Sequence, residues 1–188
     1  QCAGLSGGDF GDVMSVNYFA AVALAAGLRE LLAAGDSPRA VIVASSATLL
    51  PADAALEEAC LDGNEALARA LATAPSPAPA HRQGEVYASS KRAISRWIRR
   101  SAAQPPWAGA GILLNGVAPG LVRTPMTQPL LDTTEGRAVL AQAVPRAVKA
   151  PAEPADIALL LAFLASPDNR YLVGQIPFCD GGTDLILR

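Results

Sequence analysis

The 188-residue chain has few of the side chains on which metal sites and nucleophilic hydrolases depend. It has one histidine, His81, and three cysteines, Cys2, Cys60 and Cys179, which form no CxxC pair. The sequence therefore disfavours a zinc site, a disulfide framework and a Ser-His or Cys-His nucleophile, and we expect no metal. Lysine is scarce as well, since arginine supplies nearly all of the 15 basic residues.

An excess of charge of one sign is also lacking. Fifteen basic residues face 17 acidic ones, so the net charge of −2 gives no electrostatic reason to expect a nucleic acid or a membrane surface as partner. The longest apolar run, 157–165, is shorter than the roughly 18 residues of a membrane-spanning helix. The sequence opens at Gln1 without a charged and then apolar leader, so we expect no secretory signal in this stretch and a cytoplasmic protein.

What the chain does have is enough apolar content to fold. At 51% hydrophobic and 17% charged residues, it can form one domain over 1–188 with a sizeable core. Helical and strand-like segments alternate, which predicts right-handed βαβ crossovers and an α/β fold with a doubly wound parallel sheet. We expect helices at 16–34, 52–74, 85–103 and 154–166, and buried strands at 40–44, 111–117 and 175–179.

Tyr87 and Lys91 lie four residues apart near the start of an expected helix, so both side chains project from one face. An ammonium group beside a phenol favours the phenolate and lowers a pKa that is ordinarily about 10. This pair can therefore act as a general acid/base near neutral pH. The alternative is that both residues are simply exposed on a polar helix face.

Two further features follow expected strands. Ser45 and Ser46 come directly after the strand at 40–44, and Pro-Gly-Leu-Val-Arg-Thr at 119–124 follows the next strand. Each could be an ordinary turn. Because ligands bind at the carboxyl ends of strands in open α/β sheets, their position at the same edge indicates a site.

These residues resemble the short-chain dehydrogenase/reductase family. Tyr-Ala-Ser-Ser-Lys at 87–91 is preceded by Ser46 and followed by Asn-Gly-Val-Ala-Pro-Gly-Leu-Val-Arg-Thr at 115–124, as in that family. Val-Asn-Tyr-Phe at 16–19 matches the helix with the family's asparagine, and Cys-Ala-Gly at 2–4 resembles its Asn-Asn-Ala-Gly motif. The resemblance covers essentially the whole chain and implies a Rossmann-like sheet.

The resemblance implies a role for each matching residue. Tyr87 would donate or accept the substrate proton, Lys91 would lower its pKa and grip the nicotinamide ribose, Ser46 would bind the carbonyl, and Asn17 would support a water in a proton relay. The cofactor is implied to be NAD or NADP, with NAD favoured. Cofactor contacts are implied for Ala3, Gly4, Tyr87, Lys91, Pro119, Gly120, Val122 and Thr124, and substrate contacts for Ser46, Met126 and Leu130.

The spacing of 41 positions between Ser46 and Tyr87 resembles the 3α-hydroxysteroid dehydrogenase/carbonyl reductase branch, which has an insertion there. The extra segment is about 52–74. This similarity implies interconversion of a secondary alcohol and a ketone on a steroid-like or other apolar carbonyl compound, and a homodimer whose pairing surface the insertion alters. The alternative is that the insertion is only a solvated helical hairpin. The stretch 125–151 would be the substrate lid, or a short helix packed on the core.

The family's opening strand and its TGxxxGxG turn, which holds the cofactor pyrophosphate, have no counterpart before Asn17. We therefore expect an N-terminally truncated sheet with an unpaired edge beside 41–44, an oxidoreductase as the complete gene product, and an inactive chain on its own. One alternative is a catalytically idle module for dimerisation or ligand binding. Another is a nucleotide-sugar epimerase, which the closing Asp-Gly-Gly at 180–182 disfavours.

Overall fold

Two buried apolar segments form the strands on which the fold is built. In the computed structural model, which describes residues 1–76 and 78–188, β1 (Arg39–Val43) pairs in parallel with β2 (Leu113–Pro119). The short strand β3 (Phe178–Cys179) pairs in parallel with the end of β2 and completes the order β1-β2-β3. Both β1 and β2 are apolar on both faces, as strands covered by helices on two sides must be.

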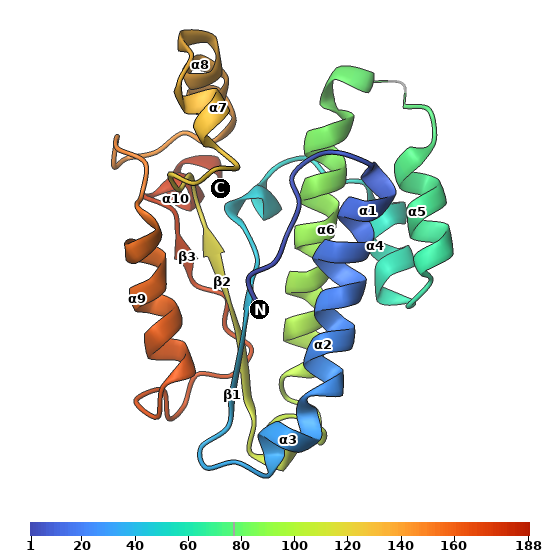
Figure 1. Ribbon diagram of the computed structural model, residues 1–188, viewed down its shortest axis with the longest axis vertical. Coiled ribbons are helices and arrows are strands. Elements are labelled where there is room, and N and C mark those ends of the chain that lie inside the picture. Colours follow the sequence, from blue (N-terminus) through green and yellow to red (C-terminus); the bar gives the residue numbers. More distant parts are fainter. Residues whose placement is uncertain (77) are drawn as a thin grey trace.

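Helices cover both faces of this sheet (Figure 1). The long helix α6 (Pro79–Ser101) lies on one face together with the helices of the N-terminal segment, and α9 (Pro154–Ala165) lies on the other. The predicted α/β fold with a parallel sheet and flanking helices is therefore confirmed. The N-terminal segment consists of α1 (Phe10–Met14), the π-helical turn η1 (Ser15–Ala20), α2 (Ala21–Gly27) and α3 (Arg29–Ala33).

The N-terminal helical segment begins earlier than its apolar spacing predicts. Asp9 accepts a hydrogen bond from the Asp12 amide and so caps α1 at residue 10 rather than 16. By length and composition alone, the segment Phe10–Gly27 is long and apolar enough to cross a membrane. It was not expected from the sequence, because only uninterrupted apolar runs were considered there. Val13, Met14 and Tyr18 are buried in the same core as α6, so we interpret the segment as a core helix.

The insertion forms two helices, α4 (Ala54–Leu61) and α5 (Glu65–Thr73), and it is not a solvated hairpin. Leu56, Cys60 and Ala68 are fully buried in the main core, where α4 packs on α6 and α5 packs on α1. The Glu57 carboxylate on α4 is also buried and forms ion pairs with two arginines of α6. These arginines are Arg92, at 3.1 Å, and Arg96, also at 3.1 Å.

Four further helices differ from the sequence expectations. The helix expected at 85–103 begins at Pro79. Proline fits the first turn of a helix, because the amide N–H that it lacks would have no acceptor within the helix at that position. The stretch 125–151, which has little period, contains α7 (Gln128–Leu131) and α8 (Thr134–Ala143). The C-terminus adds α10 (Thr183–Leu187), which was not expected. The Thr133 side chain caps the start of α8, and the Asp180 carboxylate, two residues before the N-cap Gly182, accepts from the Asp184 amide in the first turn of α10.

The expected bare edge of β1 is partly covered. The terminal ammonium of Gln1 donates to the Val41 carbonyl at 2.8 Å, and the Val43 amide donates to the Gln1 carbonyl at 3.0 Å. This is the pattern of a parallel pair, so Gln1 occupies a strand position beside β1. Among the described residues, Gln1 therefore pairs with the end of β1 that faces the site.

Gly120 permits the closest backbone approach at this end of the sheet. A Cβ on Gly120 would lie 2.6 Å from the Cα of Asp180 and 2.9 Å from its carbonyl oxygen. Asp180 in turn accepts hydrogen bonds from the amides of Gly182 and Asp184, so it cannot move away without breaking the start of α10. The Pro-Gly pair at 119–120 and the closing Asp-Gly-Gly are thus one packed unit.

We predict that Gly120→Ala destabilises the protein by about 1–3 kcal/mol, because the added methyl group overlaps the Asp180 backbone. Gly27→Ala is the matched control, since a Cβ there meets no atom within 4 Å and the residue ends a helix. Urea unfolding of both variants measures the difference. Equal stability of the two variants would contradict the assignment of Gly120 to this contact.

Candidate active site

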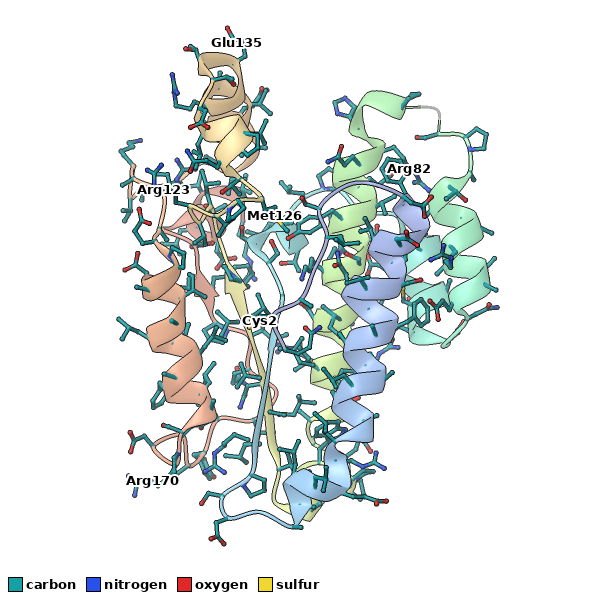
Figure 2. The ribbon with its side chains drawn as sticks, in the orientation of Figure 1. Cys2, Arg82, Arg123, Met126, Glu135 and Arg170 are labelled. Atoms are coloured by element: carbon teal, nitrogen blue, oxygen red, sulfur yellow. The ribbon has the colours of Figure 1, made fainter. Side chains whose placement is uncertain are left out.

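The carboxyl ends of β1 and β2 open into a cavity of about 320 Å³, called the sheet-edge cavity below. The two cavities described in this section meet at Tyr87 and Ser45, which line both. Figure 2 shows Cys2 and Met126 near the middle of the molecule, between α6 and the elements around β2. The sheet-edge cavity is lined by Cys2, Gly4, Val43, Ala44, Ser45, Tyr87, Lys91, Pro119, Gly120, Val122, Thr124, Pro125, Met126 and Thr127.

Lys91 is the buried cation of this site. Its side chain reaches from α6 to the end of β1, where Nζ donates a hydrogen bond to the Val43 carbonyl at 3.0 Å. Nζ also lies 5.9 Å from the centre of the Tyr87 ring. Burial lowers the pKa of Lys91 to about 8, and the nearby Cys2 acts in the opposite direction. Lys91 therefore changes its charge close to neutral pH.

Tyr87 differs from the expectation of a lowered pKa. Burial raises the pKa of its phenol, and a hydrogen bond with Ser45 acts against this without cancelling it. Lys91 does not contribute to this shift: its Nζ donates to the Val43 carbonyl and lies over the Tyr87 ring, 5.9 Å from the ring centre. Because its pKa lies above the ordinary value of about 10, the Tyr87 phenol keeps its proton at neutral pH.

The two serines after β1 have different surroundings. Ser45 accepts a hydrogen bond from the Ala47 amide at 3.1 Å, which leaves its own proton free to donate to the Tyr87 phenol. Ser46 is 5% exposed and lines only the neighbouring cavity beneath α7 and α8. Sequence reasoning selected Ser46 and missed Ser45 as the hydroxyl that pairs with Tyr87, although the Ser-Ser repeat made both available.

Asn17 is brought close to Lys91 but is engaged in structural hydrogen bonds. Its amide nitrogen donates to the Leu5 carbonyl at 2.9 Å and to Ser90 Oγ at 3.0 Å, and its oxygen accepts from the Leu5 amide at 2.8 Å. The π-helical turn of η1 carries this side chain toward the segment at Gly4. Asn17 thus fixes the N-terminal segment over α6.

The residues implied to contact a cofactor lie together, with one exception. Gly4, Pro119, Gly120, Val122 and Thr124 all line the sheet-edge cavity with Tyr87 and Lys91, whereas Ala3 does not. A Cβ on Gly4 would lie 3.2 Å from the Asn17 oxygen and 3.5 Å from Lys91 Nζ, so this residue leaves room beside the cation. The donor set and the open cradle fit the ribose and carboxamide half of a nicotinamide cofactor.

The second cavity, of about 410 Å³, lies beneath α7 and α8 and is called the lid cavity. All three residues expected to contact substrate, Ser46, Met126 and Leu130, line it with Tyr87. Its walls are largely apolar, which suits an apolar ligand with one polar group near Tyr87. Part of the wall comes from the stretch 125–151 that the sequence offered as a substrate lid, namely Thr127, Val139, Leu140, Ala143 and Val144. Lining residues that the sequence did not reveal are Ser6, Ala47, Leu50, Gln83, Gly84, Thr183 and Leu187.

Within 1–76 and 78–188, no group of three His, Cys, Asp or Glu side chains is placed to bind a metal ion. The polar groups that line the two cavities include the Tyr87 phenol and the Ser45 hydroxyl at their junction, the Ser46 hydroxyl in the lid cavity, and the Lys91 ammonium, with a pKa of about 8, in the sheet-edge cavity. These groups can bind a carbonyl oxygen and supply a proton to it. The fold and the site therefore define an α/β protein with an acid/base site at the carboxyl edge of its sheet.

Comparison with known proteins gives the family. Residues 77–184 match the family model described as enoyl-(acyl carrier protein) reductase. The whole chain is 37% identical to 3-alpha-hydroxysteroid dehydrogenase/carbonyl reductase of Comamonas testosteroni and spans 72% of that protein. A shorter stretch, 53% of the chain, is 35% identical to glucose 1-dehydrogenase of Gluconobacter oxydans and spans 36% of it.

A solved structure agrees with this result. The chain superimposes over its full length on 72% of the 3-alpha-hydroxysteroid dehydrogenase of Pseudomonas sp. B-0831, complexed with NADH, with a TM-score of 0.86 and 36% identity. Levodione reductase, at 21% identity and a TM-score of 0.72, shares the fold. The chain belongs to the short-chain dehydrogenase/reductase family of oxidoreductases.

We predict that the lysine Cε signals in a ¹³C NMR titration include one, from Lys91, that titrates near pH 8, with the exposed Lys149 as the second signal. Lys91 loses its proton more readily in the folded chain than in the unfolded one, whose lysine pKa is about 10.4. The folded state thus binds fewer protons than the unfolded state between these values, and stability rises with pH there.

Relative to Lys91→Met, which does not titrate, the wild type should gain about 2 kcal/mol of unfolding free energy between pH 8 and pH 10. Urea unfolding of both proteins at the two pH values measures this gain. A constant difference between them would show that Lys91 is not desolvated in the folded state.

Proposed function

We propose that the protein is an NAD(P)-dependent oxidoreductase that interconverts a secondary alcohol and a ketone on an apolar substrate. The observation that carries the proposal is the meeting of Tyr87 and Ser45 at the junction of the lid cavity with the sheet-edge cavity, with Ser46 in the wall of the lid cavity. A carbonyl carbon placed there would have hydroxyl donors on its oxygen and the sheet-edge cavity on its other side. The relatives named for hydroxysteroid and carbonyl compounds support the same substrate class.

The proposed chemistry follows from the protonation states. When bound, the nicotinamide cofactor supplies or accepts the hydride. In ketone reduction, Tyr87 donates its proton to the substrate oxygen as negative charge develops there, and Ser46 donates a hydrogen bond to the same oxygen. The raised pKa of Tyr87 keeps this acid protonated at neutral pH. Ser45 donates to the phenolate that remains after the transfer.

Lys91 has two proposed tasks. Its hydrogen bond to the Val43 carbonyl fixes the helix that carries Tyr87 relative to the end of β1. Its remaining protons are available to the ribose hydroxyls of the cofactor, in the space that Gly4 leaves open. We favour NAD over NADP, because the similar hydroxysteroid dehydrogenase is complexed with NADH.

The activity is proposed for a complete protein. The chain spans 72% of its hydroxysteroid dehydrogenase relative, and its 188 residues contain no TGxxxGxG turn to hold a pyrophosphate. We therefore propose that these residues alone do not turn over substrate. As a separate proposal, the enzyme acts in the cytoplasm.

We also propose a homodimer. The insertion covers part of α1 and α6, which removes those surfaces from pairing. The face of α9 remains apolar and open, with Leu159 75% exposed and Phe163 42% exposed. A catalytically idle dimerisation module would use the same face, so turnover and assembly must be measured separately.

Tyr87→Phe in the complete enzyme should lower kcat by about 10³-fold or more, because it removes the hydroxyl that donates the proton to the substrate oxygen. Tyr171→Phe removes the same hydroxyl from a side chain that is 95% exposed, and it should leave kcat unchanged. Ser46→Ala should lower kcat about 10²-fold. A Tyr87→Phe variant with normal turnover and a native circular dichroism spectrum would refute the mechanism.

Assembly is measured by light scattering. Leu159→Asp should shift the protein from dimer toward monomer, because it places a charge on the apolar face of α9. Leu31→Asp is the matched control, since Leu31 is 73% exposed on α3, away from α9. A wild type that is monomeric, or equal effects of both variants, would reject α9 as the pairing surface.

A further inference from the structure

Lys91 lies in the sheet-edge cavity without an acidic partner. It is one of two lysines in the chain and is 5% exposed. The wall of the cavity contains no Asp or Glu, and no ion pair within residues 1–76 and 78–188 includes Lys91. A buried lysine usually keeps its charge by pairing with a carboxylate. No carboxylate among the described residues stabilises the ammonium form in this way.

The neutral amine is held in the same place as the ammonium. Nζ donates a hydrogen bond to the Val43 carbonyl at 3.0 Å, and a neutral amine retains two N–H groups that can make this bond. The titratable groups that face Nζ are Tyr87 on its own helix and Cys2 on the N-terminal segment. Burial outweighs the effect of Cys2 and lowers the pKa of Lys91 to about 8. Near this pH the cavity therefore contains a fixed nitrogen with a free lone pair.

Gly4 leaves room beside this nitrogen. A Cβ on Gly4 would lie 3.5 Å from Nζ, which is an ordinary van der Waals distance. A carbon atom of a small ligand can therefore approach Nζ from the position that a side chain of residue 4 would occupy. The Tyr87 phenol lines the same cavity, keeps its proton at neutral pH and lies about one turn from Lys91 on α6. A nucleophile and an acid thus line one cavity of about 320 Å³.

We propose that Lys91 is a site of reversible covalent capture for small aldehydes, which it binds as imines with Tyr87 as the acid. The capture needs no cofactor and transfers no hydride, so it does not depend on the proposed function. An aldehyde suits this buried nitrogen better than a ketone, because its carbonyl carbon carries only one substituent besides hydrogen. In the proposed enzyme, a captured aldehyde would fill the space proposed for the cofactor.

The reaction balances without an oxidant or a reductant. The Nζ lone pair forms a bond to the aldehyde carbon, and an electron pair of the C=O bond moves to the oxygen, which takes a proton from Tyr87. The nitrogen then gives a proton to the phenolate. Next the C–O bond breaks, the hydroxyl leaves as water with the phenol proton, and the nitrogen lone pair forms the C=N bond. A last proton passes from nitrogen to the phenolate, so that amine and aldehyde become imine and water.

Reductive labelling of the full chain tests the capture. The protein is incubated at about pH 8 with propanal and sodium cyanoborohydride, which reduces imines to secondary amines that survive digestion. Peptide mass spectrometry then measures the rate of propylation at Lys91 and at Lys149. Lys149 is the internal control, because it is the only other lysine and is exposed. A thiol adduct at Cys2 contains no imine, so it is not reduced and does not enter the measurement.

Lys91 should be propylated at least about 10-fold faster than Lys149, because a lysine with the ordinary pKa of about 10.4 is neutral in less than about 1% of molecules at this pH. The difference should disappear in concentrated urea, where the fold is lost. Burial alone makes a lysine react more slowly. Propylation of Lys91 at the same rate as Lys149, or at a lower rate, would therefore overturn the proposal.

Tyr87→Phe tests the acid. It should slow the propylation of Lys91 by at least about 10-fold and leave that of Lys149 unchanged, because the carbonyl oxygen loses its proton donor. Tyr171→Phe is the matched control, since it removes the same hydroxyl from a side chain that is 95% exposed. A ¹³C NMR titration of each variant checks that the Lys91 amine itself is unaltered.

Unchanged propylation of Lys91 in Tyr87→Phe would contradict the role of Tyr87 in the capture. The proposed function fails separately, because the labelling requires neither cofactor nor turnover. A protein that captures propanal at Lys91 but, in its complete form, turns over no ketone would refute the proposed function and leave the capture site standing.

Discussion

The site depends on one hydrogen bond, from Lys91 Nζ to the carbonyl of Val43. It crosses from α6 to the end of β1 and so joins the helix that carries Tyr87 to the strand that delivers Ser45 and Ser46. Without this link, the position of the phenol on α6 relative to the hydroxyls after β1 would be less firmly fixed. The burial that makes the link strong also destabilises the charge that forms it, which is why the pKa of Lys91 falls to about 8.

The same burial reverses the simplest expectation for Tyr87. A lysine four residues away on a helix suggests a lowered phenol pKa, but the ammonium is directed to a backbone carbonyl and the ring lies in an apolar wall. As a result, the Tyr87 phenol remains protonated at neutral pH and can act as an acid. Ser45 partly compensates, and the pair of adjacent serines lets one hydroxyl serve the phenol while the other faces the lid cavity.

Much of this arrangement could be predicted from the sequence, because it depends on local patterns. The strands at β1 and β2 follow from short runs of buried apolar residues. Of the expected catalytic and substrate residues, Tyr87 and Lys91 line the sheet-edge cavity, Ser46, Met126 and Leu130 line the lid cavity with Tyr87, and Asn17 lines neither. What escaped prediction depends on contacts between distant segments. The helices at 128–143 lack an apolar period, and of the two only α8 begins at a side-chain cap, that of Thr133. The burial of Glu57 between two arginines of α6 joins residues almost 40 positions apart.

Side chains that look equivalent in the sequence thus acquire different environments. The cysteines are a further case, since Cys60 is buried and its thiol pKa is raised to about 12, first by burial and then by Glu57 and Glu65. Cys2, in contrast, is exposed and lines the sheet-edge cavity close to Lys91. A thiol-directed fluorophore would therefore attach at Cys2 in preference to Cys60. The label would stand at the entrance to the proposed cofactor site, where it could report occupancy without any engineered residue.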